Sequence, residues 1–543
     1  MRRYILILLY ISALFAPLSA QSTREVRASW VTVLGNMDWP DTRATTTQRA
    51  EKQKKELTDI LDRLKAAGIN TVLLQTRVRG SVIYPSKIEP FTENISGRNG
   101  QSPGYDPLRF AINECHKRGM QLHAWVVAVP LGGRRVMSKT GNRSVISKQR
   151  DICLRYRGCW YLNPGHPGAR KYLASIVAEI VDNYDIDGIH LDYIRYPKRT
   201  SRFPDLREYK KYGQGRDKEN WRRDNITEMV REVYKTVKQR KPWVWVSSAP
   251  LGKLRDTKRY SAKGWNAHYT VCQDVERWLK EGIQDMIFPM MYYRGNNYYP
   301  FALDWKEKSN GRAIVSGLGI WFMEPREQNW PLEEITREIN FCRHAGLAGQ
   351  AHYRNRFLLK DLKGLYTTLK NNEYSHPALM PRMTWIDSIA PAAPEKADIH
   401  KGKLTWKTPT DKKQTRYNIY SSAHYPVDTE LAENLTAAYI DGNSWKIPEG
   451  LKDKYFSITA IDRYGNESEP TEANISEIIH PLILNKGDKL QHNPKSEGRI
   501  IITTSSDIIV RSCDKLESKC IKGLANGIYT VRDKNKTLGY IVR

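Results

Sequence analysis

The residues with the clearest potential for chemistry lie in one short segment, residues 185–197, with the sequence DIDGIHLDYIRYP. Side chains alternate in direction along a β-strand, so His190 and Asp192 point to one side and the apolar residues between them to the other. A carboxylate near an imidazole and the guanidinium of Arg195 has its ionisation set by its neighbours, as acid–base or nucleophilic catalysis requires. We predict that Asp192 is catalytic and that His190 and Arg195 tune it. The alternative is a structural ion pair of Asp192 with Arg195 or with an arginine of the inner layer of the barrel.

Glycoside hydrolysis is one reaction that uses such a group, and it usually needs a second carboxyl, about 5 Å away for retention or about 6.5–9.5 Å away for inversion. Asp38, Asp187 and Glu324 are the candidates. Asp187 precedes Asp192 by five residues and suits a structural place beneath the site equally well. Glu324 follows a predicted strand but lies in a loop of unknown direction. We predict the catalytic residues among Asp192, Asp187 and Glu324, and the second carboxyl stays open.

The sequence around this segment predicts its scaffold. From residue 25 to about residue 370, apolar strand-like runs alternate with amphipathic helical stretches. The predicted strands are residues 26–33, 71–75, 122–129, 188–192, 243–248, 286–291, 313–320 and 347–352. The predicted helices are residues 48–67, 108–118, 169–184, 220–239, 271–281, 303–308, 332–345 and 360–370.

Eight strands that each lead into a crossover favour a closed parallel barrel, because closure removes both sheet edges. Four of the predicted helices end in a glycine that leads into a strand: Gly68, Gly119, Gly282 and Gly346. An open doubly wound sheet would need a Gly-rich phosphate loop after an early strand, and the sequence has none. We therefore predict an α/β fold for residues 21–380, a (β/α)₈ TIM barrel.

In a parallel barrel the C-terminal ends of the strands meet on one face, where the active sites of this fold lie. Flat rings with polar edges stack on pyranoses, and the aromatic residues that map to this face are Trp30, Trp39, Trp125, Tyr193, Tyr196, Tyr292, Tyr293 and Trp321. We predict a sugar ligand. The predicted substrate-binding residues are Arg27, Trp30, Arg77, His123, Trp125, His190, Tyr193, Arg195, Tyr292, Trp321 and His352.

Other chemistries find less support. His123 and His352 are candidates for metal ligands together with Asp192, but the chain lacks a paired spacing such as H-x-H, so we predict neither a metal nor a cofactor. Ser247 and Ser248 lie on the fifth predicted strand without a G-x-S-x-G elbow, which argues against an esterase.

The first twenty residues predict export. Arg2 and Arg3 precede an apolar run at residues 4–15, and small residues up to Ala20 follow. This run is short for a bilayer span, so we predict a signal peptide at residues 1–20, with an uncleaved anchor as the alternative. No other apolar run is long enough to span a membrane. We expect the protein in the periplasm, on the outer-membrane surface or secreted.

The charge and the cysteines agree with export. Lys and Arg number 87 against 59 Asp and Glu, a net charge of +28 that attracts polyanions. No nucleic-acid-binding motif is present, so we predict a polysaccharide substrate and an anionic cell-envelope surface as partners, and no nucleic acid. Two cysteine pairs, Cys153/Cys159 and Cys513/Cys520, are close enough in sequence to form disulfides in an oxidising compartment, and the other three cysteines suit buried thiols.

The composition changes after the barrel. Residues 381–395 contain several prolines and predict a stiff linker. Short alternating runs then predict a β-sandwich at residues 396–480, and the order of its Leu-x-Trp, Tyr-x-Ile-Tyr and Tyr-Phe-x-Ile motifs resembles a fibronectin type III domain. Residues 481–543 predict a further β-rich segment. Its ending resembles the sorting segments of proteins exported by the type IX system, and an ordinary β-hairpin cap is the alternative.

Several motifs, in order, resemble the glycosyl hydrolase-like 10 family of bacterial envelope barrels. They are EVRASWVT at residues 25–32, DWP at 38–40, QTRVRG at 75–80, HAW at 123–125, NPG at 163–165 and YDIDGIHLDYIRYP at 184–197. The resemblance covers about residues 24–340 and implies a barrel glycosidase; one member of the family cuts peptide-free peptidoglycan strands. Many members have two adjacent aspartates where this chain has Asp192 and Tyr193, which puts in doubt any mechanism that needs the second one.

These observations predict an exported glycoside hydrolase acting on an amino-sugar polysaccharide, with peptidoglycan glycan strands as the best candidate. The alternative is a glycan-binding or adhesion protein on a barrel that has lost its chemistry. The unmatched second aspartate and the lack of carboxylates on the fifth strand favour that alternative.

Overall fold

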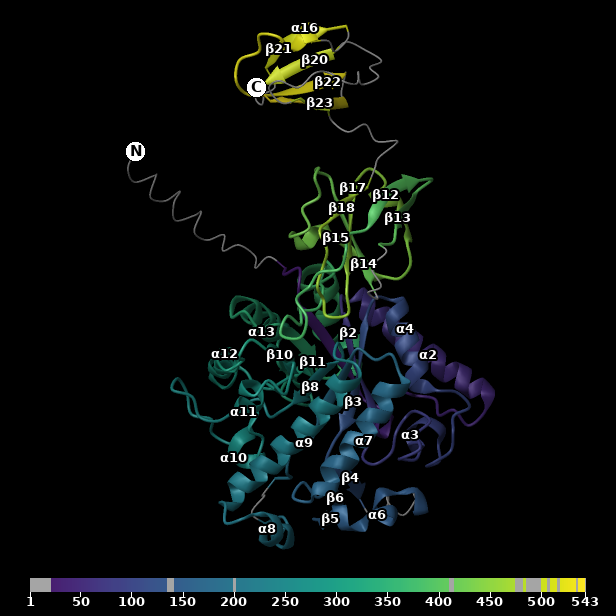
Figure 1. Ribbon diagram of the computed structural model, residues 1–543, viewed down its shortest axis with the longest axis vertical. Coiled ribbons are helices and arrows are strands. Elements are labelled where there is room, and N and C mark those ends of the chain that lie inside the picture. The colour runs from purple at the N-terminus through teal and green to yellow at the C-terminus, as the bar shows by residue number, and fades with distance from the viewer. Residues whose placement is uncertain are drawn as a thin grey trace.

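The computed structural model describes residues 21–133, 141–198, 202–409, 415–473, 482–484, 500–504, 508–514, 518–533 and 536–542, so the predicted signal peptide lies outside the described residues. A barrel, a β-sandwich and a small C-terminal sheet follow one another along the chain (Figure 1). No helix in these ranges is both long enough and apolar enough to cross a membrane.

Eight parallel strands form the closed barrel, which confirms the predicted TIM-barrel fold. Its closing pair places Val26 of the first strand beside Gly349 of the last. The strands are β1 (Val26–Val31), β2 (Thr71–Arg77), β3 (Gln121–Val127), β7 (Gly188–Asp192), β8 (Trp245–Ala249), β9 (Met286–Ile287), β10 (Ala313–Leu318) and β11 (Gly349–His352). Strand β9 is shorter than the predicted residues 286–291, because Pro289 has no backbone N–H to continue the ladder.

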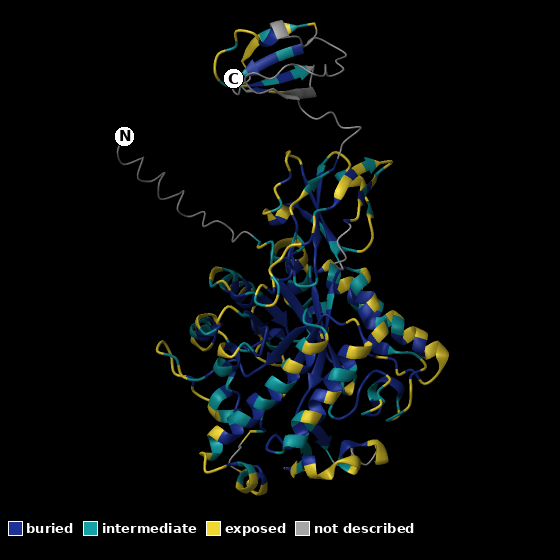
Figure 2. Cartoon of the chain, in the orientation of Figure 1, coloured by how far each residue is buried: buried dark blue, intermediate teal, exposed yellow. Residues whose placement is uncertain are grey.

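Helices surround the barrel and turn their exposed faces to solvent (Figure 2). In α2 the buried residues Ala50, Leu57, Leu61 and Leu64 recur at helical spacing and form the face that packs inward. The outer helices are α2 (Thr47–Ala66), α4 (Pro107–Lys117), α7 (Pro167–Asn183), α9 (Lys218–Arg240), α11 (Val275–Lys280), α12 (Tyr299–Glu307), α13 (Leu332–His344) and α15 (Leu365–Thr368). Shorter helices in the connections are α3 (Glu93–Ser96), α6 (Val145–Lys148), α8 (Leu206–Tyr212), α10 (Ala267–Val271) and α14 (Asn355–Leu359).

The predicted helix at residues 360–370 is interrupted. Asp361, Lys363 and Gly364 have φ angles of 53°, 52° and 80°, and this left-handed backbone cannot continue a right-handed helix. The chain instead forms α14, a short turn and α15. The glycines predicted to end helices do adopt this conformation, with φ of 76° at Gly68 and 61° at Gly119.

A small antiparallel sheet is inserted between β3 and α7, at the end of the barrel where the strands terminate (Figure 1). It consists of β4 (Pro130–Gly133), β5 (Cys153–Tyr156) and β6 (Cys159–Leu162). Cys153 pairs in register with Leu162, and Cys159 with Tyr156, so the two cysteines occupy opposite ends of the hairpin and stay free. Of the two predicted cysteine pairs, only Cys513–Cys520 forms a disulfide.

Two antiparallel sheets form the sandwich after the barrel. One contains β12 (Glu395–His400), β13 (Lys403–Lys407) and β16 (Ser444–Lys446), and the other contains β15 (Leu435–Ile440), β14 (Arg416–Ser422), β17 (Tyr455–Ile461) and β18 (Thr471–Glu472). Leu404, Trp406, Ile419 and Ile458 pack between them. The sandwich architecture is confirmed, and its identity as a fibronectin type III domain stays a prediction.

The C-terminal segment forms a separate five-stranded sheet. Its strands are β19 (Leu482–Leu484), β20 (Ile500–Thr504), β21 (Ile509–Cys513), β22 (Ile528–Asp533) and β23 (Lys536–Val542), with α16 (Ser518–Ile521) between β21 and β22. The predicted role of this segment as a sorting signal stays a prediction.

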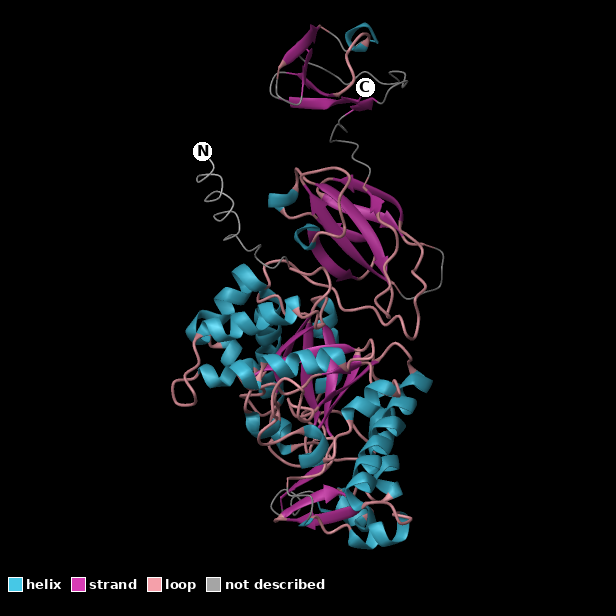
Figure 3. Cartoon of the chain, turned by 90° about the vertical axis from the view of Figure 1, so that its left-hand side faces the viewer, coloured by secondary structure: helices cyan, strands magenta, loops and turns pink. Residues whose placement is uncertain are grey.

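The sandwich packs against the N-terminal end of the barrel, opposite the end where the strands terminate (Figures 1 and 3). Arg463 Nη2 lies 2.8 Å from Asp185 Oδ1, just before β7. Within the predicted linker, Met383 is buried and Trp385 Nε1 donates to Asp285 Oδ1 at 2.9 Å. One apolar cluster includes residues from the barrel and the sandwich: Val26, Ala28, Trp245, Met286, Tyr420, Leu435, Tyr439 and Ile461. The first part of the predicted linker, around Met383 and Trp385, is therefore packed against the barrel.

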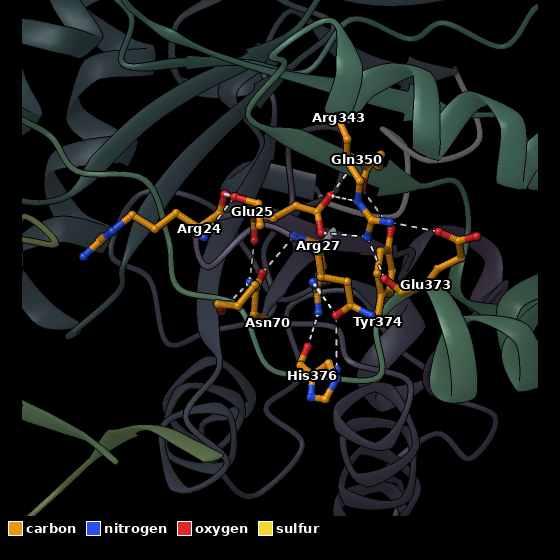
Figure 4. Close-up of polar contacts among 12 residues, drawn as sticks. Arg24, Glu25, Arg27, Asn70, Arg343, Gln350, Glu373, Tyr374 and His376 are labelled. Atoms are coloured by element: carbon orange, nitrogen blue, oxygen red, sulfur yellow. Dashed lines mark hydrogen bonds and ion pairs between the residues drawn. The ribbon is translucent and has the colours of Figure 1, made fainter. Parts of the chain in front are cut away.

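A buried ionic network occupies the same end of the barrel (Figure 4). Glu25 accepts hydrogen bonds from Arg27 Nε at 2.8 Å and from Arg343 Nε at 2.9 Å and Nη2 at 3.1 Å. Burial alone would raise the pKa of the Glu25 carboxyl, but the two guanidinium groups hold this pKa below its ordinary value. Arg27 also donates to the carbonyl of His376 at 2.6 Å. Arg27 was predicted to bind substrate at the barrel mouth, and it lies at the opposite end because it is near the start of β1.

We predict that Arg343→Met lowers the free energy of unfolding by about 3 kcal/mol, because Glu25 stays charged and buried while it loses a cationic partner. Urea unfolding, monitored by circular dichroism, measures the free energy of unfolding of the variant and of the unaltered protein. Lys52→Met, which removes an exposed charge from α2, is the matched control. Equal losses in the two variants would show that the network does not stabilise the barrel.

Candidate active site

The carboxylate of Asp192 occupies the end of β7, inside the barrel mouth, with only 6% of the residue exposed. Its Oδ1 accepts a hydrogen bond from the backbone N–H of Tyr193 at 2.6 Å, and its Oδ2 accepts one from Trp125 Nε1 at 3.2 Å. Burial raises the pKa of the Asp192 carboxyl to about 6, while Arg195, these two donors and Arg79 act in the opposite direction. Asp192 can therefore hold a proton close to neutral pH.

Tyr193 and Arg195 lie beside this carboxyl. Tyr193 has a φ of 51°, which turns the chain sharply after β7, and its side chain is exposed. The Arg195 guanidinium carbon lies 4.6 Å from the centre of the Tyr193 ring. Arg195 Nη1 is buried and has no hydrogen-bond acceptor among the described residues. This donor is thus unsatisfied within the described part of the protein.

A cluster of aromatic rings lies on the strands and loops across the mouth from β7. The rings of Tyr292 and Tyr353 stack with centroids 5.4 Å apart, and Trp321 lies 5.6 Å and 5.7 Å from them. Trp30 packs beneath, 5.9 Å from Tyr353. Burial, and to a smaller extent the charge of Asp192, raises the pKa of Tyr353 to about 12 and that of Tyr292 well above its ordinary value. Both phenols keep their protons and can donate hydrogen bonds.

His190 does not contact Asp192, contrary to its predicted tuning role. Its Nε2 accepts from Trp30 Nε1 at 3.1 Å, so its Nδ1 carries the proton and donates to Ser247 Oγ at 3.0 Å. Burial and then the nearby His123 hold the pKa of His190 well below its ordinary value. The neutral ring fixes the indole of Trp30, and its effect on the site passes through that side chain.

The other two predicted histidines are also neutral and completely buried. His123 Nε2 lies 3.1 Å from Gln121 Oε1, and His352 Nε2 lies 3.1 Å from the hydroxyl of Tyr374. Burial lowers the pKa of each to about 4. Neither is placed to touch a substrate at the mouth. Among the described residues, no group of three or more His, Cys, Asp or Glu side chains could hold a metal ion.

Arg77 was predicted to bind substrate, and the structure places it in a closed structural pair. It is 0% exposed, and its Nε and Nη2 donate to both oxygens of Glu89 at 2.8 Å and 2.6 Å. It also donates to the carbonyls of Val127 and Ala128. These contacts use four of its five N–H donors, and the complete burial of Arg77 keeps it from a ligand at the mouth.

Each of the remaining candidate carboxyls is held by partners of its own. Asp187 lies at the N-terminal end of β7, where its Oδ2 is 2.8 Å from His116 Nε2 and accepts from the Leu122 N–H at 2.9 Å. Asp38 is held by Arg354 at 2.6 Å and by the Thr32 N–H at 2.8 Å. Glu324 pairs with Lys360 at 3.2 Å in the loop after β10.

A cleft of about 320 Å³ opens beside Tyr193 and Arg195. Its walls are Arg79, Pro130, Gly132, Cys159, Tyr161, Tyr193, Arg195, Tyr196, Pro197, Lys198, Trp265 and Val271. Tyr161 comes from the inserted sheet and Trp265 from the loop before α10, and neither was predicted at the site. Both lie outside the barrel strands, where strand periodicity gives no signal. Tyr353 directly follows the predicted strand that ends at His352, and this position could identify it as a residue of the barrel mouth.

The sequence model of the family glycosyl hydrolase-like 10 matches residues 25–315. Glycosyl hydrolase YngK of Bacillus subtilis (strain 168) is 30% identical over 485 residues, which are 84% of this chain and 94% of that protein. Glycosyl hydrolase DigH of Escherichia coli (strain K12) is 34% identical over 292 residues, 50% of this chain and 66% of that protein.

Among solved structures, the glycoside hydrolase domain of PgaB (BpsB) from Bordetella bronchiseptica superposes with a TM-score of 0.42 and 14% identity, over 64% of this chain and 98% of that one. The match to the family spans more than half of the sequence, and the similarity to YngK extends along most of it. The protein therefore belongs to the glycosyl hydrolase-like 10 family and is a glycoside hydrolase.

Proposed function

We propose that the protein is an exported enzyme that cuts an amino-sugar polysaccharide, with peptidoglycan glycan strands as the best candidate, and that Asp192 is its general acid. The environment of Asp192 carries this proposal. A carboxyl with a pKa of about 6 keeps its proton close to the operating pH, as protonation of a leaving glycosidic oxygen requires. Its place in a mouth lined by rings suits a sugar substrate.

The neighbours of Asp192 have separate roles in this proposal. Arg195 and Arg79 favour the charged form of the carboxyl, so they stabilise the carboxylate that forms as the proton leaves. Tyr292, Trp321 and Tyr353 offer ring surfaces and phenol donors to the sugar. Asp187 and Glu324 receive no catalytic role, because Asp187 lies at the other end of the barrel and Glu324 is paired with Lys360.

Export and location belong to the same proposal. Residues 1–20 would direct the chain out of the cytoplasm, and residues 481–543 are the candidate sorting segment. The net charge of +28 would favour retention at an anionic cell-envelope surface. The resemblance to envelope barrels supports peptidoglycan strands over other amino-sugar polymers.

We predict that Asp192→Asn lowers the release of new reducing ends from peptide-free glycan strands at least about a hundredfold, because the amide cannot donate the proton. Asp59→Asn on the exposed side of α2 is the control and should keep its activity. Chitin oligomers test whether a neutral amino-sugar polymer is also cut. Binding of glycan by the unaltered protein without new reducing ends would favour the alternative, a glycan-binding protein.

We predict that the kcat/KM of the unaltered enzyme falls as the pH rises through about 6, because a general acid is active only while protonated. The Trp125 N–H stabilises the charged form of Asp192, so Trp125→Phe should raise this pKa and move the fall in activity to higher pH, by about half a unit to one unit. In Trp321→Phe the midpoint should stay in place, since the Trp321 N–H has no partner among the described residues. If kcat/KM falls as the pH is lowered instead, Asp192 acts in its deprotonated form, as a nucleophile or base.

A further inference from the structure

The cleft beside Asp192 has an unusual charge. Its described walls carry three cationic side chains, Arg79, Arg195 and Lys198, and contain no aspartate or glutamate. Asp192 is not among these walls, although its carboxyl interacts with the charges of Arg195 and Arg79. A partly enclosed cavity with a surplus of cations attracts an anionic group.

The cations are not consumed by structural ion pairs. Arg195 Nη1 is buried and lacks an acceptor among the described residues, which is costly unless a ligand supplies one. Arg79 has a φ of 52° at the turn after β2 and forms no ion pair with a described carboxylate. Lys198 is exposed, and its Nζ lies 3.9 Å from the centre of the Trp265 ring. All three can therefore turn to a ligand.

The aromatic walls of the cleft suit a sugar. Tyr193 and Trp265 are each 41% exposed, and Tyr161 completes a set of rings around the cations. The volume of about 320 Å³ falls in the range of small-molecule sites, about 300–1,000 Å³. A pyranose ring can stack on these side chains while a substituent reaches the guanidinium groups.

We propose that this cleft is a subsite for a sugar that bears a carboxylate, next to the sugar whose bond Asp192 protonates. Guanidinium groups suit this task because their planar donors match the two oxygens of a carboxylate. The proposal rests on the proposed function, in which Asp192 acts on a polymer of sugars, and it adds the residues that recognise the charge of that polymer. Arg79, Lys198 and Trp265 become specificity-determining residues.

The test uses binding, so that its outcome is separate from catalysis. All proteins carry Asp192→Asn, so that the ligand is not consumed. One probe is a tetrasaccharide of alternating N-acetylglucosamine and N-acetylmuramic acid with free lactyl carboxylates. The second is the same tetrasaccharide with each carboxylate converted to a methylamide, which removes the charge and leaves the sugars unchanged. Titration calorimetry at low and high salt gives both affinities.

The acidic probe should bind roughly tenfold more tightly than its amide. High salt should reduce this ratio of affinities, since the carboxylate of the probe and the cations that bind it lie in a solvent-accessible cleft. Arg79→Gln and Lys198→Gln should each lower the ratio, and the double variant should lower it further, to the part that Arg195 alone supplies. Lys52→Gln, which removes one exposed charge from α2, should leave it unchanged. Equal binding of the two probes by the reference protein would overturn the proposal.

The result also separates this proposal from the proposed function. Discrimination between the probes, without release of reducing ends by the enzyme that retains Asp192, would support the subsite and reject the catalytic role. Release of reducing ends without discrimination between the probes would support the catalytic role and reject the subsite.

Discussion

The burial of one carboxyl at the end of β7 is the constraint on which the site depends. Asp192 is removed from water, yet each of its oxygens accepts a hydrogen bond, and Arg195 and Arg79 lie close enough to favour its charge. Desolvation outweighs these favourable contacts, and the pKa rises to about 6. Full exposure would leave the carboxyl ionised at neutral pH, and a closer ion pair with Arg195 would do the same. The barrel maintains this balance because β3 fixes Trp125 beside β7, and the segments that follow β7 and β2 hold Tyr193, Arg195 and Arg79.

The two ends of the barrel use charged residues in opposite ways. At the N-terminal end, Glu25 and Asp187 are ionised and surrounded by cations, and the sandwich covers them with Arg463 and an apolar interface. At the C-terminal end, Asp192 has a raised pKa and Arg195 retains an unpaired donor. Satisfied charges stabilise the scaffold, whereas incompletely satisfied ones are available to a substrate. The sandwich covers the N-terminal end of the barrel and leaves the C-terminal end open to a substrate.

Much of the fold could be predicted from the sequence, because strand and helix periodicities and the glycines at helix ends are local signals. The position of Asp192 was predictable for the same reason. Period two shows that alternate side chains face opposite sides of a strand, but it does not show which set enters the barrel or how deep it lies. Arg27 and His352 face out of the barrel toward Tyr374, whereas His123 faces inward but lies beside Gly188 at the start of β7, so none of the three reaches the mouth. The depth of a side chain in the barrel depends on the register between strands. The ion pair of Arg77 was also not predictable, because its partner Glu89 lies in a loop that periodicity does not describe. Tyr161 and Trp265 come to the cleft from an inserted sheet and a loop, through tertiary contacts alone.

The cations in the cleft connect substrate recognition to the proton on Asp192. In the free protein Arg195 and Arg79 lower the pKa of this carboxyl from the higher value that burial alone would give. A substrate carboxylate bound to the same guanidinium groups would neutralise part of their field and exclude water from the cleft. Both changes favour the protonated form of Asp192, so its pKa in the complex would exceed that of the free enzyme. Binding of an acidic sugar would then prepare the general acid, whereas a neutral sugar would leave the cations facing Asp192 and the proton more weakly held. On this reasoning the charge of the substrate affects the chemical step as well as the affinity.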